Sequence, residues 1–281
     1  MGIRRPALHD VLASAAAGDV KPGSEVTAFE PSDSRVDVSL ADGRTVAADA
    51  LVGADGIDSV VRAQLFGAQE PRYSGLTIWR AVTELDDSVL PPGSLLSFWG
   101  SGTRFVAFRV APGTIVWEAT LATEAGGTDP QSGVRPKLLE YFADFVDPVK
   151  PLIEAADERA IIRDDVCDRP PTDTWGRGRI TLLGDAAHPM TFAVGQGAAQ
   201  AFEDAVALAD SLAAGGDVEA ALRCYEQRRI KRARQFQSMA WRLARMGLPR
   251  SAVSRGLRNA FLKFTSGIGL RMQERDLHVP D

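Results

Sequence analysis

The pattern of hydrophobic and polar positions divides the chain into three stretches. The first opens with hydrophobic residues at helical spacing over residues 5–17 and continues with segments in which apolar and polar residues alternate. Asp42-Gly43 predicts a tight hairpin turn between two of these segments, and a helix is expected to begin near Asp58. The predicted strands of this stretch cover residues 25–30, 35–41, 44–48 and 50–54.

The second stretch is rich in aromatic and β-branched residues, and glycine and proline punctuate it at the spacing of an antiparallel sheet. A helix over residues 134–146 and a short strand over residues 160–163 are predicted to complete it. The main strands are expected over residues 76–84, 94–99, 104–110 and 114–120.

The third stretch returns to alternating strand and helix, with a strand over residues 179–183 and long helices over 195–213 and 218–246. The order therefore predicts an α/β fold, α+β overall, in which one domain interrupts another. The predicted boundaries are 1–70 and 171–250 for the interrupted domain, 71–170 for the β-rich insert and 251–281 for a C-terminal helical tail.

Composition restricts the partners and the location. The net charge of −5 and the pI of about 5.4 argue against a nucleic-acid footprint or a polybasic membrane patch. No run of apolar residues is long enough for an integral membrane segment, and no signal peptide is recognisable. Cys167 and Cys224 lie far apart without metal-ligand spacing, so we expect a reduced, cytoplasmic protein with no metal site.

The segment that carries chemistry is the strand, loop and helix over residues 179–213. Gly184 ends the strand and permits a sharp turn, and Asp185 follows at the carboxyl end, where α/β sheets place their ligands. A carboxylate there can accept hydrogen bonds from sugar or polyol hydroxyls. Gly195-Gln196-Gly197 then opens a helix, whose free N–H groups favour negative charge.

Two groups of segments carry a resemblance to known proteins. The first group is Gly184-Asp-Ala-Ala-His-Pro189 followed by Gly195-Gln-Gly197 and Glu203-Asp-Ala205, the Asp55-Gly56 motif with Ser59 and Arg62, and Arg5-Pro-Ala-Leu8. The second group is Tyr73-Ser-Gly75 with Trp79-Arg80, Phe98-Trp-Gly100 and Tyr225-Glu-x-Arg-Arg229. The first group resembles the FAD-dependent aromatic-ring monooxygenases of the p-hydroxybenzoate hydroxylase-like fold. The second resembles the subgroup of this family that contains urate hydroxylase, zeaxanthin epoxidase and salicylate hydroxylase-like enzymes.

This resemblance implies an FAD-binding domain with an inserted antiparallel-sheet substrate domain. NAD(P)H would act as transient electron donor, and O₂ would form a flavin C4a-hydroperoxide that hydroxylates or epoxidises a small aromatic or alkene substrate. The residues implied to bind FAD are Arg5, Asp55, Gly184, Asp185, Gly195, Gln196 and Gly197. The substrate-pocket candidates are Arg80, Arg104 and Trp117.

The chain departs from the family pattern at three points. The Gly-x-Gly-x-x-Gly turn that holds the FAD pyrophosphate is absent, so an N-terminal part is expected to be missing. Phe192 replaces the usual second proline of the loop after Pro189. Val116 stands where urate-hydroxylase-like members have a tyrosine about twelve residues after an arginine, here Arg104, which argues against urate.

The missing motif leaves an alternative to an enzyme. The chain is then a non-catalytic truncated fragment, or a binding or assembly partner that needs a complementing N-terminal chain to hold FAD.

Individual residues also allow two interpretations. Asp55 either binds the cofactor or caps its own turn, and Arg80 either faces the substrate or lies exposed on an alternating strand. His188 is expected to be structural, with no carboxylate spaced along the sequence to orient it. A group of arginines resembles the solvated face of a helix, paired with glutamates: Arg228, Arg229, Arg232 and Arg234.

Overall fold

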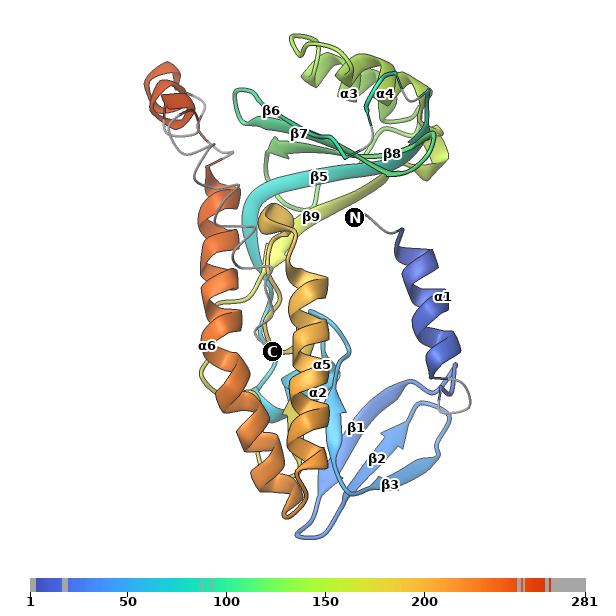
Figure 1. Ribbon diagram of the computed structural model, residues 1–281, viewed down its shortest axis with the longest axis vertical. Helices are drawn as coiled ribbons and strands as arrows, with labels where there is room; N and C mark the ends of the chain where they lie inside the picture. The colour runs from blue at the N-terminus through green and yellow to red at the C-terminus, as the bar shows by residue number, and fades with distance from the viewer. Residues whose placement is uncertain are drawn as a thin grey trace.

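The computed structural model describes residues 4–16, 20–86, 88–91, 93–246, 249, 251–260 and 263. Figure 1 shows an elongated molecule with one sheet at each end and two long helices running between them. These helices are α5 (Gly197–Ala213) and α6 (Val218–Arg245), which pack against each other. The side chain of Asp217 accepts a hydrogen bond from the Ala220 N–H and so caps the start of α6.

The N-terminal part contains a helix and a three-stranded antiparallel sheet in sequential order. Its elements are α1 (Arg5–Ala15), β1 (Val26–Pro31), β2 (Val36–Leu40) and β3 (Thr45–Ala48). The turn between β2 and β3 contains Gly43 at φ +85°, the left-handed conformation that a glycine adopts without a steric penalty. This is the hairpin that Asp42-Gly43 predicts.

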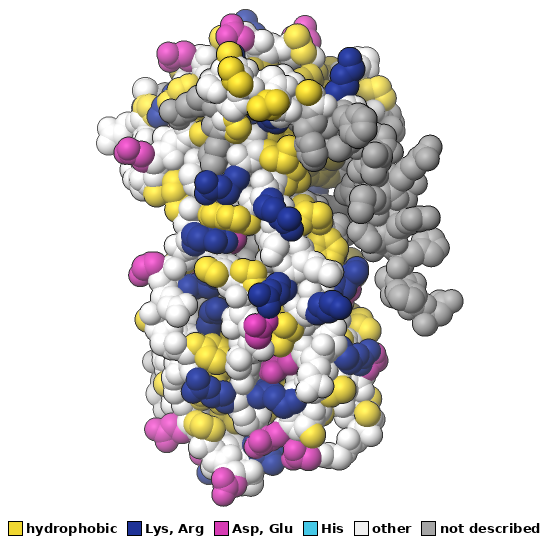
Figure 2. All heavy atoms as spheres, turned by 90° about the vertical axis from the view of Figure 1, so that its left-hand side faces the viewer, with side chains coloured by type: hydrophobic (Ala, Val, Ile, Leu, Met, Phe, Trp, Pro, Cys, Tyr) yellow, Lys and Arg dark blue, Asp and Glu magenta, His cyan; other side chains and the backbone are white. Residues whose placement is uncertain are grey.

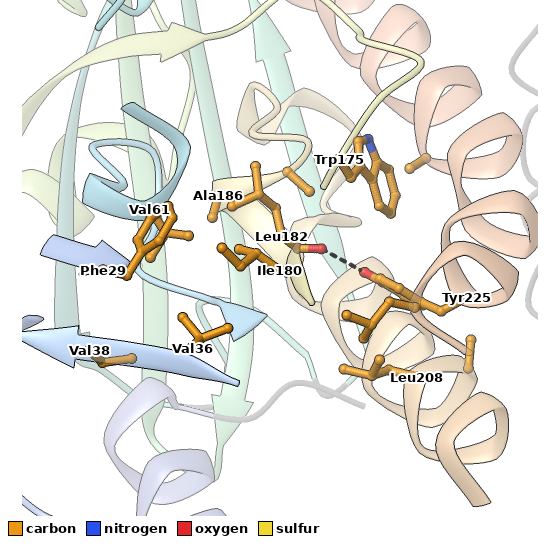
Figure 3. Packing of buried hydrophobic residues seen from close by; sticks show 14 of the residues in the cluster. Phe29, Val36, Val38, Val61, Trp175, Ile180, Leu182, Ala186, Leu208 and Tyr225 are labelled. Atoms are coloured by element: carbon orange, nitrogen blue, oxygen red, sulfur yellow. Dashed lines mark hydrogen bonds between the residues drawn. The ribbon is translucent and has the colours of Figure 1, made fainter. Parts of the chain in front are cut away.

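A short parallel pair of strands joins the two halves of the interrupted unit. β4 (Leu51–Gly53) lies beside β10 (Ile180–Leu182), with Ile180 opposite Leu51. The helix α2 (Val60–Phe66) follows β4, and Gln64 on it exchanges two hydrogen bonds with the backbone of Phe29 on β1. Segments some 130 positions apart in the sequence thereby form one hydrophobic core. Figure 3 shows this core, in which the Tyr225 hydroxyl donates to the Leu182 carbonyl at 3.1 Å.

The other sheet has five antiparallel strands in the order β6-β7-β8-β5-β9. Its strands are β5 (Arg72–Glu84), β6 (Leu95–Trp99), β7 (Thr103–Ala111), β8 (Thr114–Ala122) and β9 (Ile162–Asp168). Two short helices, α3 (Arg135–Tyr141) and α4 (Val149–Ala155), cover one of its faces, as Figure 1 shows. The core under these helices is aromatic, with the rings of Phe105 and Trp117 stacked at 5.6 Å between centroids.

Three single turns of 3-10 helix complete the elements: η1 (Glu158–Ala160), η2 (Gly184–Ala186) and η3 (Phe192–Val194). Both α6 and β5 contact the region of η3, so this turn lies where the five-stranded sheet meets the long helices. Phe192 packs there beside a cluster that contains Leu76 and Ala244.

The α/β fold with an inserted antiparallel sheet is confirmed, whereas two element predictions are wrong. The helix predicted over 134–146 ends at Tyr141, where Phe142 turns inward to contact Phe105 and Phe145. The strand predicted over 160–163 begins at Ile162 and continues to Asp168, because it pairs along β5. The domain boundaries near residues 70 and 170 stay a prediction. Residues 252–260 of the predicted tail are helical, and most of the rest lies outside the described residues.

Candidate functional site: the loop after β10 and the open face of the sheet

The backbone turns sharply as soon as β10 ends. Gly184 has φ +60°, and a Cβ placed on it would lie 3.3 Å from the Cβ of Ala201 on α5. Its N–H donates to Oδ2 of Asp204 at 3.0 Å. Because a side chain at this position would meet both backbone strain and crowding, glycine is required for the close approach of β10 to α5.

Asp185 follows Gly184 and has an exposed side chain. No residue within the described ranges donates a hydrogen bond to its carboxylate. Surrounding protein displaces water and raises the pKa of this carboxyl, while electrostatic interactions with His188 and then with Arg5 act in the opposite direction. Arg5, at the start of α1, therefore lies near enough to Asp185 for their charges to interact.

The start of α5 faces open space. Gly195 adopts φ +65° and ends η3, and Gln196 is the N-cap residue of α5. A Cβ added at Gly195 or Gly197 would meet no atom within 4 Å. The first N–H groups of a helix have no partner inside it, so this end of α5 offers donors and a positive dipole end to an approaching ligand.

A network of buried polar side chains connects the loop after β10 to α5 and α6. Asp204, fully buried on α5, accepts from the Gly184 N–H, lies 2.5 Å from Nε2 of His188 and accepts from Nε of Arg229 at 2.7 Å. Arg229 on α6 also binds the side chains of Glu203 and Gln200. We call His188, Gln200, Glu203, Asp204 and Arg229 the Asp204 network.

The Asp204 network corrects two expectations. His188 has a carboxylate that orients it, which comes from α5, sixteen positions later in the sequence. Arg229 is buried and does not belong to a solvated face, although the expected pairing with glutamate is present. Arg228, Arg232 and Arg234 do form ion pairs at or near the surface, with Asp210, Glu203 and Asp173 respectively. Figure 2 shows Lys and Arg side chains spread along this side of the molecule.

The Asp55-Gly56 motif supports the same loop from the β4 side. Asp55 accepts hydrogen bonds from the Ser59 hydroxyl at 2.5 Å and from the Val61 N–H at 3.2 Å, so it caps the start of α2 together with Ser59, the N-cap residue. Arg62, buried on α2, donates to the carbonyls of Ala186 and Ala187 at 3.1 Å each. Two motifs far apart in the sequence are thereby joined through one guanidinium group.

The face of the five-stranded sheet that α3 and α4 leave uncovered is turned toward the N-terminal end of α1 in Figure 1, and Phe192 and Ala193 of η3 pack against part of it. We call it the open face. Arg104 lies on it, with Nε donating to the Ser97 hydroxyl at 3.2 Å and its guanidinium 4.5 Å from the ring centroid of Trp99. Trp99, Arg104, Thr120, Phe192 and Leu243 line a small hollow between this face, η3 and α6.

Arg80 and Trp117, the other two substrate-pocket candidates, have surroundings different from those of Arg104. Arg80 shares the open face but is exposed and paired with Asp164 on β9. Trp117 points into the aromatic core under α3 and α4, is fully buried, and donates its indole N–H to Thr83 at 2.9 Å. The expectation that Trp117 shares a pocket with Arg104 is therefore corrected, since alternate residues of a strand point to opposite faces.

Known proteins resemble the chain in sequence and in structure. Residues 158–240 match the profile of a family described as FAD binding domain. The aurachin C monooxygenase/isomerase of Stigmatella aurantiaca is 40% identical over 265 residues, which cover 94% of this chain and 69% of that protein. This chain belongs to the FAD-dependent aromatic-ring monooxygenases.

Two further members of this monooxygenase family show how far the likeness extends. The chloroplastic zeaxanthin epoxidase of Oryza sativa subsp. japonica is 40% identical over 249 residues, and the match spans 85% of this chain but 38% of the epoxidase. The crystal structure of Klebsiella pneumoniae HpxO complexed with FAD and uric acid superposes with a TM-score of 0.85 at 31% identity. That match covers 91% of this chain and 67% of HpxO.

FAD is the cofactor of this monooxygenase family, and the groups around the start of α5 fit part of it. The Asp185 carboxylate accepts no hydrogen bond from a described residue, and the space before Gly195 and Gly197 is open. Nδ1 of His188 and the Thr191 hydroxyl are buried in the same loop without a described partner. These groups suit the flavin ring and ribityl chain. The chain has no Gly-x-Gly-x-x-Gly motif for the pyrophosphate.

The structure thus brings most of the predicted site residues to one region. Gly184, Asp185 and residues 195–197 belong to the same loop system, and Arg5 lies within electrostatic reach of it. Asp55 supports that loop indirectly, through α2 and its residue Arg62, and both of its carboxylate oxygens accept hydrogen bonds. Glu118, on the open face beside Arg104, was not among the predicted residues. Glu118 follows Trp117 in a strand whose residues 117–120 alternate between apolar and polar, and this alternation is the sequence signal that places the two side chains on opposite faces.

Neither a group of metal ligands nor a membrane-spanning helix is found among the described residues. Within them, no three or more His, Cys, Asp or Glu side chains are grouped so that they could hold a metal ion. No helix that the structure describes is both long and apolar enough to cross a membrane.

Proposed function

We propose that this chain carries the flavin and substrate sites of an NAD(P)H-using monooxygenase that hydroxylates or epoxidises a small aromatic or alkene substrate. The observation that supports it best is the arrangement around the start of α5. The start of α5 faces open space near the Asp185 carboxylate, to which no described residue donates, and η3, just before α5, borders the small hollow on the open face that Arg104 lines. Bound FAD supplies transfer of reducing equivalents from NAD(P)H to molecular oxygen.

The residues of the chain have separate tasks in this proposal. Asp185 accepts hydrogen bonds from ribityl hydroxyls, and Arg5 adds positive charge beside it. The N–H groups at Gly197 and after it stabilise negative charge on the flavin, because they are preorganised at a helix N-terminus. Phe192, Leu76 and Ala244 form an apolar wall that keeps water from the space between cofactor and sheet.

The substrate lies against the open face in this proposal. Arg104 is held by Ser97 and Trp99 and offers donors to a polar substituent or a carbonyl of the substrate. Burial lowers the pKa of the Arg104 guanidinium, and the nearby Glu118 carboxylate raises it. HpxO has been crystallised with uric acid. We do not extend urate to this chain, because the apolar Val116 stands where urate-hydroxylase-like relatives have tyrosine.

The absorption spectrum of the purified chain tests the proposal. After incubation with FAD and desalting, the near-ultraviolet and blue bands of bound flavin are expected, together with NADH or NADPH oxidation stimulated by an aromatic compound. A colourless protein would contradict the proposal for this chain alone.

A second candidate function has an observation of its own. The described part of α1 has no buried residue, and its apolar Val11 and Leu12 are exposed. A further polypeptide segment that covers this surface and supplies the pyrophosphate site would make the chain a component that binds FAD only in combination. Flavin retention that appears only on mixing with a polypeptide that contains the Gly-x-Gly-x-x-Gly unit would support this candidate.

A further inference from the structure

Glu118 lies at the centre of the open face. It belongs to β8, which is flanked by β7 and β5, and the register places it between Val106 on one side and Arg80 on the other. Its sequence neighbours Trp117 and Ala119 are both buried in the core under α3 and α4. Because successive side chains of a strand alternate, the Glu118 carboxylate projects from the opposite, open face.

The surrounding cations do not bind this carboxylate. Arg80 is engaged with Asp164, and Arg104 is engaged with Ser97 and Trp99. Throughout the part of the chain that the structure describes, Glu118 receives no hydrogen bond and forms no ion pair. Burial raises the pKa of the Glu118 carboxyl, and the charges of Arg80 and then of Arg104 act in the opposite direction.

A half-buried carboxylate without a donor has a cost in free energy, because it has lost part of its water without a replacement. The side chains next to it show what would replace that water. The adjacent row of the sheet holds Trp99, Arg104 and Thr120, which line the hollow that Phe192 closes on the other side. A strong acceptor therefore borders a surface of two aromatic rings and a guanidinium plane. This combination matches a flat aromatic molecule that carries its own donor.

We infer that Glu118 is a substrate-binding residue that selects aromatic substrates carrying an O–H or N–H group, which donates to its carboxylate. The inference rests on the proposed function, which places the substrate against the open face. It assigns the polar end of the substrate to Glu118 and the ring to the surface of the open face next to Arg104, outside the small hollow that Trp99 and Phe192 line. Arg104 then contacts the ring plane or a second substituent.

Matched ligand pairs test this inference. The full chain, incubated with FAD, is titrated by calorimetry with 2-naphthol against 2-methoxynaphthalene, and with indole against 1-methylindole. Each pair differs by one methyl group that removes the donor. The donor-bearing member is expected to bind about tenfold more tightly or better, as a hydrogen bond to a charged group predicts. In Glu118→Gln that ratio is expected to fall to within about threefold.

Glu84→Gln is the matched control, since Glu84 is an exposed residue near the end of β5 and should leave the ratio unchanged. Equal binding of both members by the unmodified chain would overturn the inference, whatever the variant does. So would a preference that persists in Glu118→Gln, or the failure of all four compounds to bind. Calorimetry measures binding without turnover, so the inference and the proposed function can fail separately. If the donor-bearing ligands bind more tightly and this difference depends on Glu118, but the chain does not oxidise NAD(P)H, the inference holds and the proposed function is refuted.

Discussion

Carboxylate side chains have opposite roles in the Asp204 network and at the edge of the candidate site, where Asp185 and Glu118 lie. Asp204 is fully buried and contacts a backbone N–H, a histidine and an arginine. Asp185, nineteen positions earlier, is exposed and accepts no hydrogen bond from a described residue, and Glu118 on the open face is likewise unpaired. The difference separates carboxylates that hold the fold from carboxylates that remain available to ligands.

The largest effect is expected from breaking the Asp204 network. Asp204→Asn keeps the shape but leaves the buried Arg229 without one of its two carboxylates and weakens the contact with His188. The free energy of unfolding should fall by about 3 kcal/mol, as it does when one partner of a buried ion pair is removed. Urea unfolding measures it. Asp210→Asn, at an exposed pair with Arg228, is the control and should change stability by less than about 1 kcal/mol.

The opposite combination is expected for Asp185, at the edge of the site: unchanged stability and weaker cofactor binding. Asp185→Asn should leave stability nearly unchanged, because no described residue donates to this carboxylate. It should weaken FAD binding about tenfold, because a neutral amide replaces a charged acceptor for ribityl hydroxyls. Titration of apoprotein with FAD, followed by quenching of flavin fluorescence, gives the affinity. Large destabilisation with unchanged FAD affinity would place Asp185 among the residues that hold the fold.

The smallest effect concerns pH and Glu118. Its raised pKa means that ionisation is harder in the folded than in the unfolded protein, so the unmodified chain loses stability as pH rises through the interval above the ordinary glutamate value. Glu118→Gln lacks this proton. Its stability relative to the unmodified chain should therefore increase as the pH rises above the ordinary glutamate pKa, by less than Asp204→Asn removes, and urea unfolding at a series of pH values measures the trend. The same trend in Glu84→Gln would show that the effect does not come from Glu118.

Periodicity and local motifs predicted the fold well, because each of these signals acts over a few neighbouring residues. The turn at Asp42-Gly43, the parallel strand β4 and the glycines at Gly184 and Gly195 are examples. The approximate limits of α5 and α6 followed from hydrophobic spacing in the same way.

Pairing between distant segments was harder to predict. The contact of His188 with Asp204 crosses a loop and a helix turn, and the burial of Arg229 depends on how α6 packs against α5. Trp117 was named as a substrate-pocket candidate together with Arg104, whereas the pairing of β7 with β8 places the two side chains on opposite faces of the sheet. The role of Asp55 remained open in the sequence because capping and cofactor binding use the same carboxylate.

The length of α6 restricts the motions available to the molecule. Its 28 residues extend for about 42 Å. Near one end Tyr225 is bonded to β10, and near the other Trp241 stacks under Arg72 of β5, with 3.5 Å from guanidinium carbon to ring centroid. The parallel pair β4-β10 and the five-stranded sheet are therefore held at opposite ends of one helix, and a change in their separation requires this helix to bend or one of the two contacts to break. Amide hydrogen exchange should be slow along the middle of α6 and fast in α1, none of whose described residues is buried.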